Sequence, residues 1–506
     1  MNERIWSAEQ TAILDYFHSG KGNLVVRARA GTGKTTTIIE GTTRAPEKAI
    51  CCFAFNTKIK DELAGRIVNP YASASTLHAA GFGCVRRFWT GVRVGKNNDR
   101  ADALTEFVCG STAPDTVKRL VSKLHTKGRE INPHARNIGD LTDLLYRFEC
   151  EPDETWDGSK YDAEYVECRA LEAMDRAATI KPLDTGIDFS DMIYLPVRNH
   201  WMNKVYDLVV VDEAQDMTTA QLEIAMGVCK GRIVVVGDDR QAVYGFRGAD
   251  SDSLDRLKNV LKAHELGLKT TYRCGTEIVN LAASLVPDFV AGPNNPTGEV
   301  IYLPLDKLVE TVQPGDFVLS RTNAPLVSTA MGLLRQQKRA RIAGRDIGTG
   351  LKALVRKLAK GAAANSVPAF IERVGIWEQR EANRMLRAKR EAQVELVHDK
   401  AEILFTIAAD AKSVRDIEAR IDGLFTDDGL GQAGVITCSS VHRSKGLEAN
   451  RVFVLASTLY PRGHNREEEN IEYVAITRAK KSLFMVFDPN QTGSYGNQVL
   501  NGTSNH

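Results

Sequence analysis

In "LVVRARAGTGKTTT", Leu24 to Thr37, a short apolar run leads into a glycine-rich turn. The apolar run is typical of a buried strand, and the residues after the turn are predicted to open a helix. Such a turn presents backbone N–H groups and the positive end of the helix to a phosphate. The sequence therefore predicts a phosphate-binding loop in an α/β domain.

Each residue type in this loop has an expected task. Gly31 and Gly33 let backbone N–H groups close on phosphate oxygens. Lys34 supplies a positive charge, and Thr35 offers its hydroxyl to Mg²⁺. Ala28 stands where the general pattern has glycine, and a chance glycine-rich turn is the alternative. The predicted nucleotide-binding segment is Ala28, Arg29, Ala30, Gly31, Thr32, Gly33, Lys34, Thr35 and Thr36.

A pair of carboxylates follows a second apolar run, in "VVVDEAQD". At the end of a strand, Asp212 can hold Mg²⁺ through water, and Glu213 can orient or deprotonate an attacking water. A simple helix N-cap is the alternative for such a pair. Together with the phosphate loop, the pair favours nucleotide hydrolysis.

Apolar runs rich in Val and Ile recur between helical stretches, near residues 24, 49, 207 and 232 and again near 316, 434, 451 and 483. This pattern is typical of parallel sheets with helices on both faces, so we predict two α/β domains. Two spans without strand patterns interrupt them and are predicted to be helical insertions. The predicted boundaries are 1–95 and 180–262 for the first domain, 96–179 for its insertion, 263–349 and 425–489 for the second domain, 350–424 for its insertion, and 490–506 for a flexible tail.

Composition narrows the class of protein further. Lysine plus arginine number 66 against 64 acidic residues, so a polyanion would be held by local basic patches. The nine cysteines contain no C-x-x-C pair, which argues against zinc, iron–sulfur and disulfide frameworks. The opening residues "MNERIWSAEQ" lack the apolar core expected of a signal peptide, and no apolar run approaches the ~20 residues of a membrane span. We expect a cytoplasmic, nucleoid-associated protein of a bacterial or phage-infected cell.

Five motifs occur in a fixed order: "DEAQD", "GDDRQAVYGFRGAD", "TYRCGTEI", "VHRSKGLEANRVFVL" and "EYVAITRAKKSL". This series resembles the UvrD/Rep-like superfamily 1 DNA helicases of the 3′–5′ branch. The resemblance implies an α/β fold of two RecA-like P-loop NTPase domains with two helical insertions. It also implies ATP and Mg²⁺ as cofactors and translocation 3′ to 5′ on single-stranded DNA, with unwinding of duplex in replication, repair or recombination.

The resemblance also implies roles for single residues around ATP. Gln10 resembles the glutamine that reads the adenine edge, and Tyr272 the aromatic residue that stacks on the base. Gln241 resembles the γ-phosphate sensor, and Glu448 the carboxylate near the ribose. Arg273 and Arg478 resemble the two arginines that reach the γ-phosphate from the second domain. For Arg478, a surface salt bridge at a strand end is the alternative. The predicted catalytic residues are Lys34, Asp212, Glu213, Gln241, Arg273 and Arg478.

Other residues match family segments that line a channel for single-stranded DNA. In the first domain they are Phe55, Asn56, His78, Tyr244, Phe246 and Arg247, and in the second Thr437, His442 and Arg443. Aromatic faces stack on bases without sequence preference, although Phe55 and Tyr244 could instead be core residues. "GIDFSDMIYL", Gly186 to Leu195, resembles the stretch that returns the chain to the first domain.

The chain departs from the family pattern at three positions. Arg29 replaces the usual second glycine of the loop, Thr36 stands where an adenine-stacking arginine is common, and Phe246 replaces a tryptophan. Expected partners are single-stranded DNA, junctions with duplex and replication or repair proteins, with no membrane and a monomeric state. The competing functions are a translocase that strips proteins from DNA and an ATP-gated DNA-binding switch. An RNA helicase is disfavoured, because the residues of the five motifs resemble those of the DNA-directed branch of the family.

Overall fold

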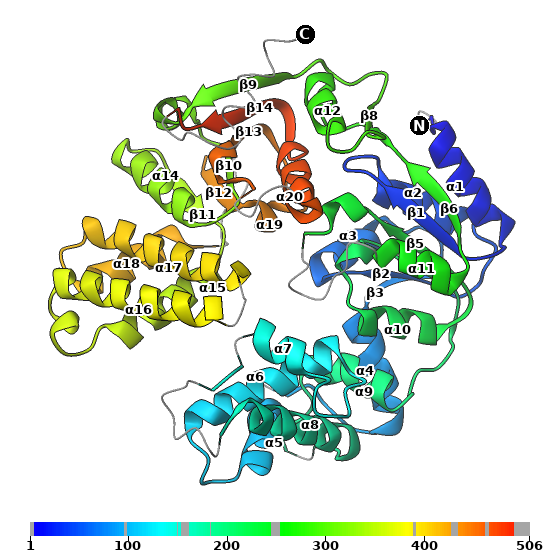
Figure 1. Cartoon of the computed structure of the whole chain (residues 1–506). Helices are drawn as coiled ribbons and strands as arrows, with labels where there is room; N and C mark the ends of the chain where they lie inside the picture. The colour runs from blue at the N-terminus through cyan, green and yellow to red at the C-terminus, as the bar shows by residue number, and fades with distance from the viewer. Residues whose placement is uncertain are drawn as a thin grey trace. The chain divides into compact units, whose positions relative to one another are not determined.

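The computed structural model describes residues 5–95, 99–148, 150–152, 161–182, 184–243, 253–387, 391–426, 434–460 and 465–489. The chain divides into two compact units after Lys269 (Figure 1). Each unit contains a six-stranded sheet in which all neighbouring strands run parallel. The predicted tail, 490–506, lies outside the described residues. The predicted class, parallel α/β with helical additions, is confirmed.

The first sheet has the strand order β3-β2-β4-β5-β1-β6. The four apolar runs predicted for this domain all form strands in it. The strands are β1 (Leu24–Ala28), β2 (Ile50–Ala54), β3 (Ala72–Thr76), β4 (Tyr206–Val211), β5 (Cys229–Gly237) and β6 (His264–Leu268). Val209 and Val211 pack into one buried cluster, whereas Leu208 and Val210 pack into another. Both faces of the sheet are therefore covered, as the unbroken apolar runs indicate.

Helices cover the two faces of this sheet. On one face pack α1 (Ala8–Ser19), α2 (Lys34–Arg44) and α3 (Thr57–Arg66), through residues such as Phe17, Ile38 and Leu63. On the other face pack α10 (Thr219–Val228) and α11 (Ser253–Leu261).

The boundary between the units corrects one prediction. β6 pairs with β1 in the first sheet, so the first unit continues through Lys269 and not only to residue 262. The sequence "HELGL" of this strand is short, partly exposed and less apolar than its neighbours, and only pairing with β1 identifies it as part of the first sheet.

The first insertion is a helical subdomain with its own core. Every described element between residues 99 and 179 is a helix: α5 (Asp99–Cys109), α6 (Asp115–Ile131), α7 (Thr142–Arg147) and α8 (Ala163–Thr179). They pack with α4 (Leu77–Phe88) and α9 (Phe189–Arg198) around one apolar cluster. Because α4 and α9 also contribute to the core beside the sheet, they join the insertion to the sheet.

The second sheet has the order β11-β12-β10-β13-β14-β9. Its strands are β9 (Glu299–Pro304), β10 (Phe317–Ser320), β11 (Ala340–Ile342), β12 (Ile436–Ser440), β13 (Ala449–Leu455) and β14 (Ala479–Phe487). The main accompanying elements are α12 (Thr276–Ala283), α13 (Leu308–Thr311), α14 (Ala324–Arg335), α19 (Val441–Ser444) and α20 (Arg466–Ile476), with the short pair β7 (Thr270–Thr271) and β8 (Val290–Ala291).

The second insertion is also helical and shares its core with the second sheet. It consists of α15 (Arg345–Leu358), α16 (Val367–Arg387), α17 (Glu391–Ala409) and α18 (Val414–Leu424). It begins at Arg345, before the predicted residue 350, directly after Gly344, whose positive φ of 137° suits glycine. Phe370 and Val374 of the charged helix α16 are fully buried, so this helix is amphipathic and not wholly solvated. No helix within the described ranges is long and apolar enough to cross a membrane.

Candidate nucleotide-binding site

The phosphate loop of the first unit has the geometry that its sequence predicts. β1 ends at Ala28 and α2 begins at Lys34. Gly31 and Gly33 have φ angles of 69° and 81°, which residues with a Cβ atom adopt only with strain. Two threonine hydroxyls brace the turn, because Thr32 Oγ1 donates to Arg29 O at 2.9 Å and Thr37 Oγ1 donates to Gly33 O at 3.0 Å.

The loop lysine and the carboxylate pair meet in space. Lys34 Nζ lies 3.0 Å from Glu213 Oε1, and Asp212 beside it is 3% exposed. Burial alone lowers the pKa of Lys34, but the charges of Glu213, Asp238 and Asp212 outweigh burial and raise it above its usual value. Burial and then repulsion from Glu213 raise the pKa of Asp212 to about 7. The site is thus rich in buried negative charge that a cation would stabilise.

The residues present fit a magnesium ion. Asp212 supplies a buried carboxylate, and in the described part of the chain the Thr35 hydroxyl has no hydrogen-bond partner. Carboxylate, hydroxyl and phosphate oxygens are the ligands that Mg²⁺ takes at phosphate loops.

A buried glutamine that the sequence reasoning missed holds Glu213 in place. Gln215 Nε2 donates to Glu213 Oε2 at 2.5 Å, and Gln215 Oε1 accepts from the backbone N–H of Asp238 at 3.0 Å. Glu213 itself has a positive φ of 52°, an uncommon conformation for a residue other than glycine. The signal lay in "DEAQD", where Gln215 follows two residues after Glu213. The carboxylate is therefore positioned from both sides, by Lys34 and by Gln215.

Arg29, one of the three departures from the family pattern, has a structural role. Its Nη1 donates to Asp238 Oδ1 at 3.1 Å and to Asp239 Oδ1 at 2.8 Å, and the residue is 6% exposed. Gln241 Nε2 donates to the other oxygen of Asp238 at 2.7 Å. The arginine ties the phosphate loop to the segment after β5 that carries the predicted γ-phosphate sensor.

Gln10 lies at the phosphate loop, but its amide is occupied within the protein. Its Oε1 accepts from Ser7 N at 3.1 Å and its Nε2 donates to Thr32 O at 3.4 Å. The first contact is half of a capping box at the start of α1. A glutamine amide has two N–H donors and two acceptor lone pairs, so these bonds orient the amide and leave it capacity to read an adenine edge.

The predicted nucleotide residues of the second unit gather around Glu448. Arg273 Nε lies 2.7 Å from Glu448 Oε2, and Lys480 Nζ pairs with the other oxygen. Burial raises the pKa of Glu448, but Lys480 and Arg273 outweigh it and hold the pKa below its usual range. Tyr272 is 47% exposed, and its ring lies against Gly292, where a Cβ atom would come within 2.8 Å of the ring. Tyr272 therefore offers an exposed aromatic face.

Arg478 is buried, so the predicted alternative of an exposed salt bridge is wrong. It is 1% exposed and donates to Val474 O at 2.9 Å, to Leu447 O at 3.2 Å and to Thr477 Oγ1 at 3.2 Å. Burial and then the neighbouring charge of Arg273 lower the pKa of Arg478 to about 10. A buried guanidinium is stabilised by an anionic partner, so a phosphate oxygen would suit Arg478.

Among the predicted DNA residues of the first unit that the structure describes, Phe55 and His78 are half-buried and Asn56 is exposed, and an unpredicted aromatic accompanies them. Asn56 caps α3 by accepting from Ile59 N at 2.9 Å, and Phe55 beside it is half-buried. The ring of His78 packs edge-on against Phe189, with centroids 6.1 Å apart. Phe189 is 67% exposed at the start of α9 and was not singled out in "GIDFSDMIYL". The exposure of Phe189 depends on the tertiary structure, so the residue type alone does not predict it.

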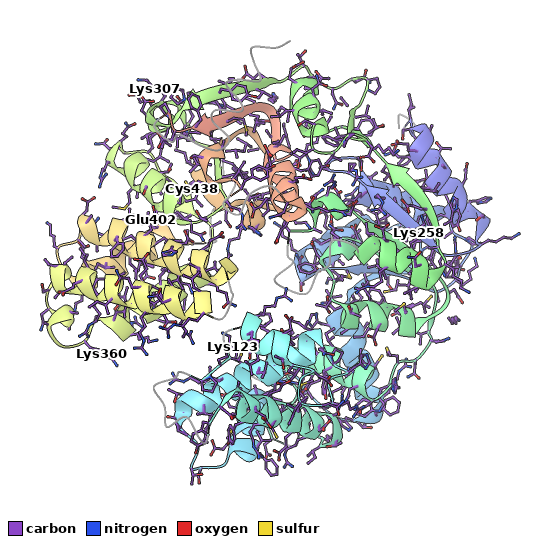
Figure 2. All side chains as sticks on the ribbon, viewed as in Figure 1. Lys123, Lys258, Lys307, Lys360, Glu402 and Cys438 are labelled. Carbon is purple, nitrogen blue, oxygen red and sulfur yellow. The ribbon has the colours of Figure 1, made fainter. Side chains whose placement is uncertain are left out.

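An open groove of about 850 Å³ lies beside Phe189 between α5, α6 and α9. Basic side chains of α6, Lys118, Arg119, Lys123 and Lys127, line it together with acidic residues (Lys123 is labelled in Figure 2). Lys118 and Lys127 are each paired with a glutamate, at 2.7 Å. The groove therefore places the exposed ring of Phe189, a surface on which a base can stack, beside a mixed lining of four basic and five acidic side chains.

The predicted DNA residues of the second unit differ in accessibility. Thr437 is fully buried in β12, so its side chain does not reach the surface. His442 and Arg443 lie on α19, and Arg443 pairs with Asp346 at the start of α15. Tyr244, Phe246 and Arg247 lie outside the described residues.

Two family models match this chain, one in each unit. The model of the UvrD/REP helicase N-terminal domain matches residues 6–262, and that of the UvrD-like helicase C-terminal domain matches residues 435–486. F-box DNA helicase protein 1 of Schizosaccharomyces pombe is 25% identical over 96% of this chain and 58% of its own length. F-box DNA helicase 1 of Gallus gallus is 26% identical over 94% of this chain and 48% of its own length, so this chain spans about half of each relative. ATP-dependent DNA helicase Rep of Escherichia coli is 26% identical over 52% of this chain and 41% of its own length. Because the N-terminal model alone covers just over half of the 506 residues, the chain belongs to the UvrD/Rep helicase family.

Proposed function

We propose that this chain is an ATP-dependent DNA helicase that translocates 3′ to 5′ on single-stranded DNA and unwinds duplex. The observation that carries the proposal is the ion pair of Lys34 with Glu213 beside the buried Asp212, at the end of a phosphate loop. The names of the relatives, among them an ATP-dependent DNA helicase, support the same activity.

In this proposal the first unit holds the triphosphate. Lys34 and the loop N–H groups bind phosphate oxygens, and Asp212 and Thr35 would hold Mg²⁺, which would neutralise phosphate charge. Glu213 accepts the proton of the attacking water, and Gln241 senses the γ-phosphate. In the second unit, Tyr272 stacks on the base, Glu448 binds the ribose, and Arg273 and Arg478 stabilise the charge that develops on the γ-phosphate.

DNA binding follows from the aromatic and basic residues. Phe55, His78 and Phe189 supply faces for stacking, and Tyr244, Phe246 and Arg247 extend this set by resemblance. His442 and Arg443 provide a second grip. Thr437 is buried, so its contribution would be limited to its backbone. We propose single-stranded DNA and its junctions with duplex as the substrates of a monomer that serves replication, repair or recombination in the cytoplasm.

The test is strand displacement on duplexes that carry a 3′ or a 5′ single-stranded tail, with ATPase measured in the same reactions. We expect displacement from 3′ tails and an ATPase that single-stranded DNA stimulates. Displacement only from 5′ tails contradicts the polarity. Removal of a DNA-bound protein without strand separation selects the translocase, and DNA affinity that changes with ATP but without movement selects the switch.

A further inference from the structure

We propose that Arg66, the last residue of α3, stacks on the base of the bound nucleotide. The proposal rests on the ATP site proposed above and adds a residue that contacts its base. Arg66 Nη2 lies 2.9 Å from Thr36 Oγ1, in the first turn of α2. The contact places the planar guanidinium of Arg66, which belongs to α3, beside Thr36, which directly follows Lys34 and Thr35 on α2.

The direction of the nucleotide places its base on the side of Thr36. The lysine of a phosphate loop reaches the β- and γ-phosphates, and the loop N–H groups hold the α- and β-phosphates. Lys34 Nζ lies at Glu213, so the nucleoside extends away from Glu213. Thr36 follows Lys34 by two residues, so the two side chains leave α2 in directions that differ by about 200° around the helix axis, at 3.6 residues per turn. Thr36 therefore borders the side of α2 on which the nucleoside leaves.

An ion pair fixes the guanidinium at the end of α3. Arg66 Nη1 lies 3.2 Å from Glu62 Oε1, one turn earlier on the same helix. Together with the hydrogen bond to Thr36 Oγ1, this pair holds the guanidinium beside the first turn of α2.

The chemistry of Arg66 suits an aromatic base. A guanidinium group is planar, remains charged and stacks on aromatic faces. Thr36 offers only a hydroxyl, which holds the guanidinium but cannot stack. Thr36 and Glu62 hold the guanidinium at Nη2 and Nη1, and the side chain is 40% exposed, so it is still accessible to a ligand.

The first test is the Kd for a non-hydrolysable ATP analogue, which does not depend on turnover. Arg66→Ala is expected to raise this Kd about 5- to 30-fold, the range of a cation–π contact. Arg44→Ala is the matched control, because Arg44 forms the same kind of pair with Glu40, at 2.9 Å on α2. An equal Kd in the two variants overturns the proposal. If the wild-type chain binds no ATP analogue at all, the proposed function fails together with this proposal.

Two further measurements separate a base contact from other roles. Inorganic tripolyphosphate has no base, so its affinity should be the same in wild type and Arg66→Ala; an equal loss for tripolyphosphate shows a phosphate contact and overturns stacking. The double variant Thr36→Arg with Arg66→Ala should regain most of the affinity for the ATP analogue, because an arginine at position 36 can place its guanidinium where that of Arg66 lies. Failure of this rescue, with the double variant folded by circular dichroism, also counts against a stacking role.

Discussion

Lys34 Nζ and Glu213 Oε1 lie 3.0 Å apart, so the cation of the phosphate loop is paired with the carboxylate that is expected to act as the base. A triphosphate carries more negative charge than one carboxylate and would compete for Lys34. Glu213 would then keep Gln215 as its partner, 2.5 Å away, and face the site of the attacking water. The pairing gives a physical link between nucleotide binding and activation of the base.

Glu213→Gln should abolish turnover and spare binding. The amide keeps the size of the side chain but cannot accept a proton, so we expect kcat for ATP to fall by about 10²–10⁴. The Kd for ATP should stay the same or decrease, because Lys34 loses a competing partner. Steady-state ATPase with single-stranded DNA and equilibrium binding measure the two effects. Glu223→Gln, at a surface site on α10 that contacts His134, is the control, and near-normal kcat in Glu213→Gln would show that another group is the base.

Phe189→Ala should weaken binding of single-stranded DNA. Stacking of a base on an aromatic side chain contributes about 1–3 kcal/mol, so Kd should rise about 5- to 150-fold. Phe107→Ala is the control, because Phe107 is 58% exposed on α5 of the same subdomain but does not line the groove. Fluorescence anisotropy with an oligonucleotide measures both variants. Equal Kd values in the two variants would show that Phe189 does not contact DNA.

Arg129→Met should destabilise the first unit. Arg129 is fully buried on α6 and donates to Asp188 at 2.9 and 2.8 Å and to Asp191 at 2.6 Å. Its removal leaves two carboxylates without this partner inside the subdomain, which typically costs about 3–5 kcal/mol. Urea unfolding measures the loss, and Arg119→Met, an exposed change on the same helix, is the control. A loss as small as that of the control would contradict the prediction.

The stability of the first unit should fall in mild acid because of His125. Burial and then the charge of Arg129 lower the pKa of His125 to about 3, and the side chain is fully buried. The unfolded chain binds this proton near pH 6.5, so the stabilisation is complete above that pH and is lost as pH falls toward 3.

Between pH 7.5 and pH 5.5 the expected loss is about 1.4 kcal/mol, measured by urea unfolding. His125→Gln removes the titrating group and keeps a hydrogen-bonding side chain near Thr105 Oγ1, which lies 3.1 Å from His125 Nε2. The variant should show a smaller loss over this interval. The same loss in both proteins would assign the acid sensitivity to other groups.

The elements predicted best are those whose signal is local. The phosphate loop depends on contiguous residues and on glycines at Gly31 and Gly33, and its conformation agrees with the prediction. Eight apolar runs became strands because each is long and apolar enough to be buried on both faces. β6 was assigned to the wrong domain because its residues carry little apolar signal and its place depends on pairing with β1.

Local sequence patterns were enough to predict the class of fold, the phosphate loop, the carboxylate pair and the family, because backbone conformation and burial of apolar runs are encoded over a few neighbouring residues. The partners of the charged side chains, in contrast, depend on how distant segments pack. Arg29 meets Asp238 across 209 residues of sequence, and Arg66 meets Thr36 across 30. Strand order sets which distant segments meet, and no local pattern specifies it. The burial of Arg478 and the exposure of Phe189 follow from the same cause, because accessibility is set by the elements packed around a side chain and not by its own identity.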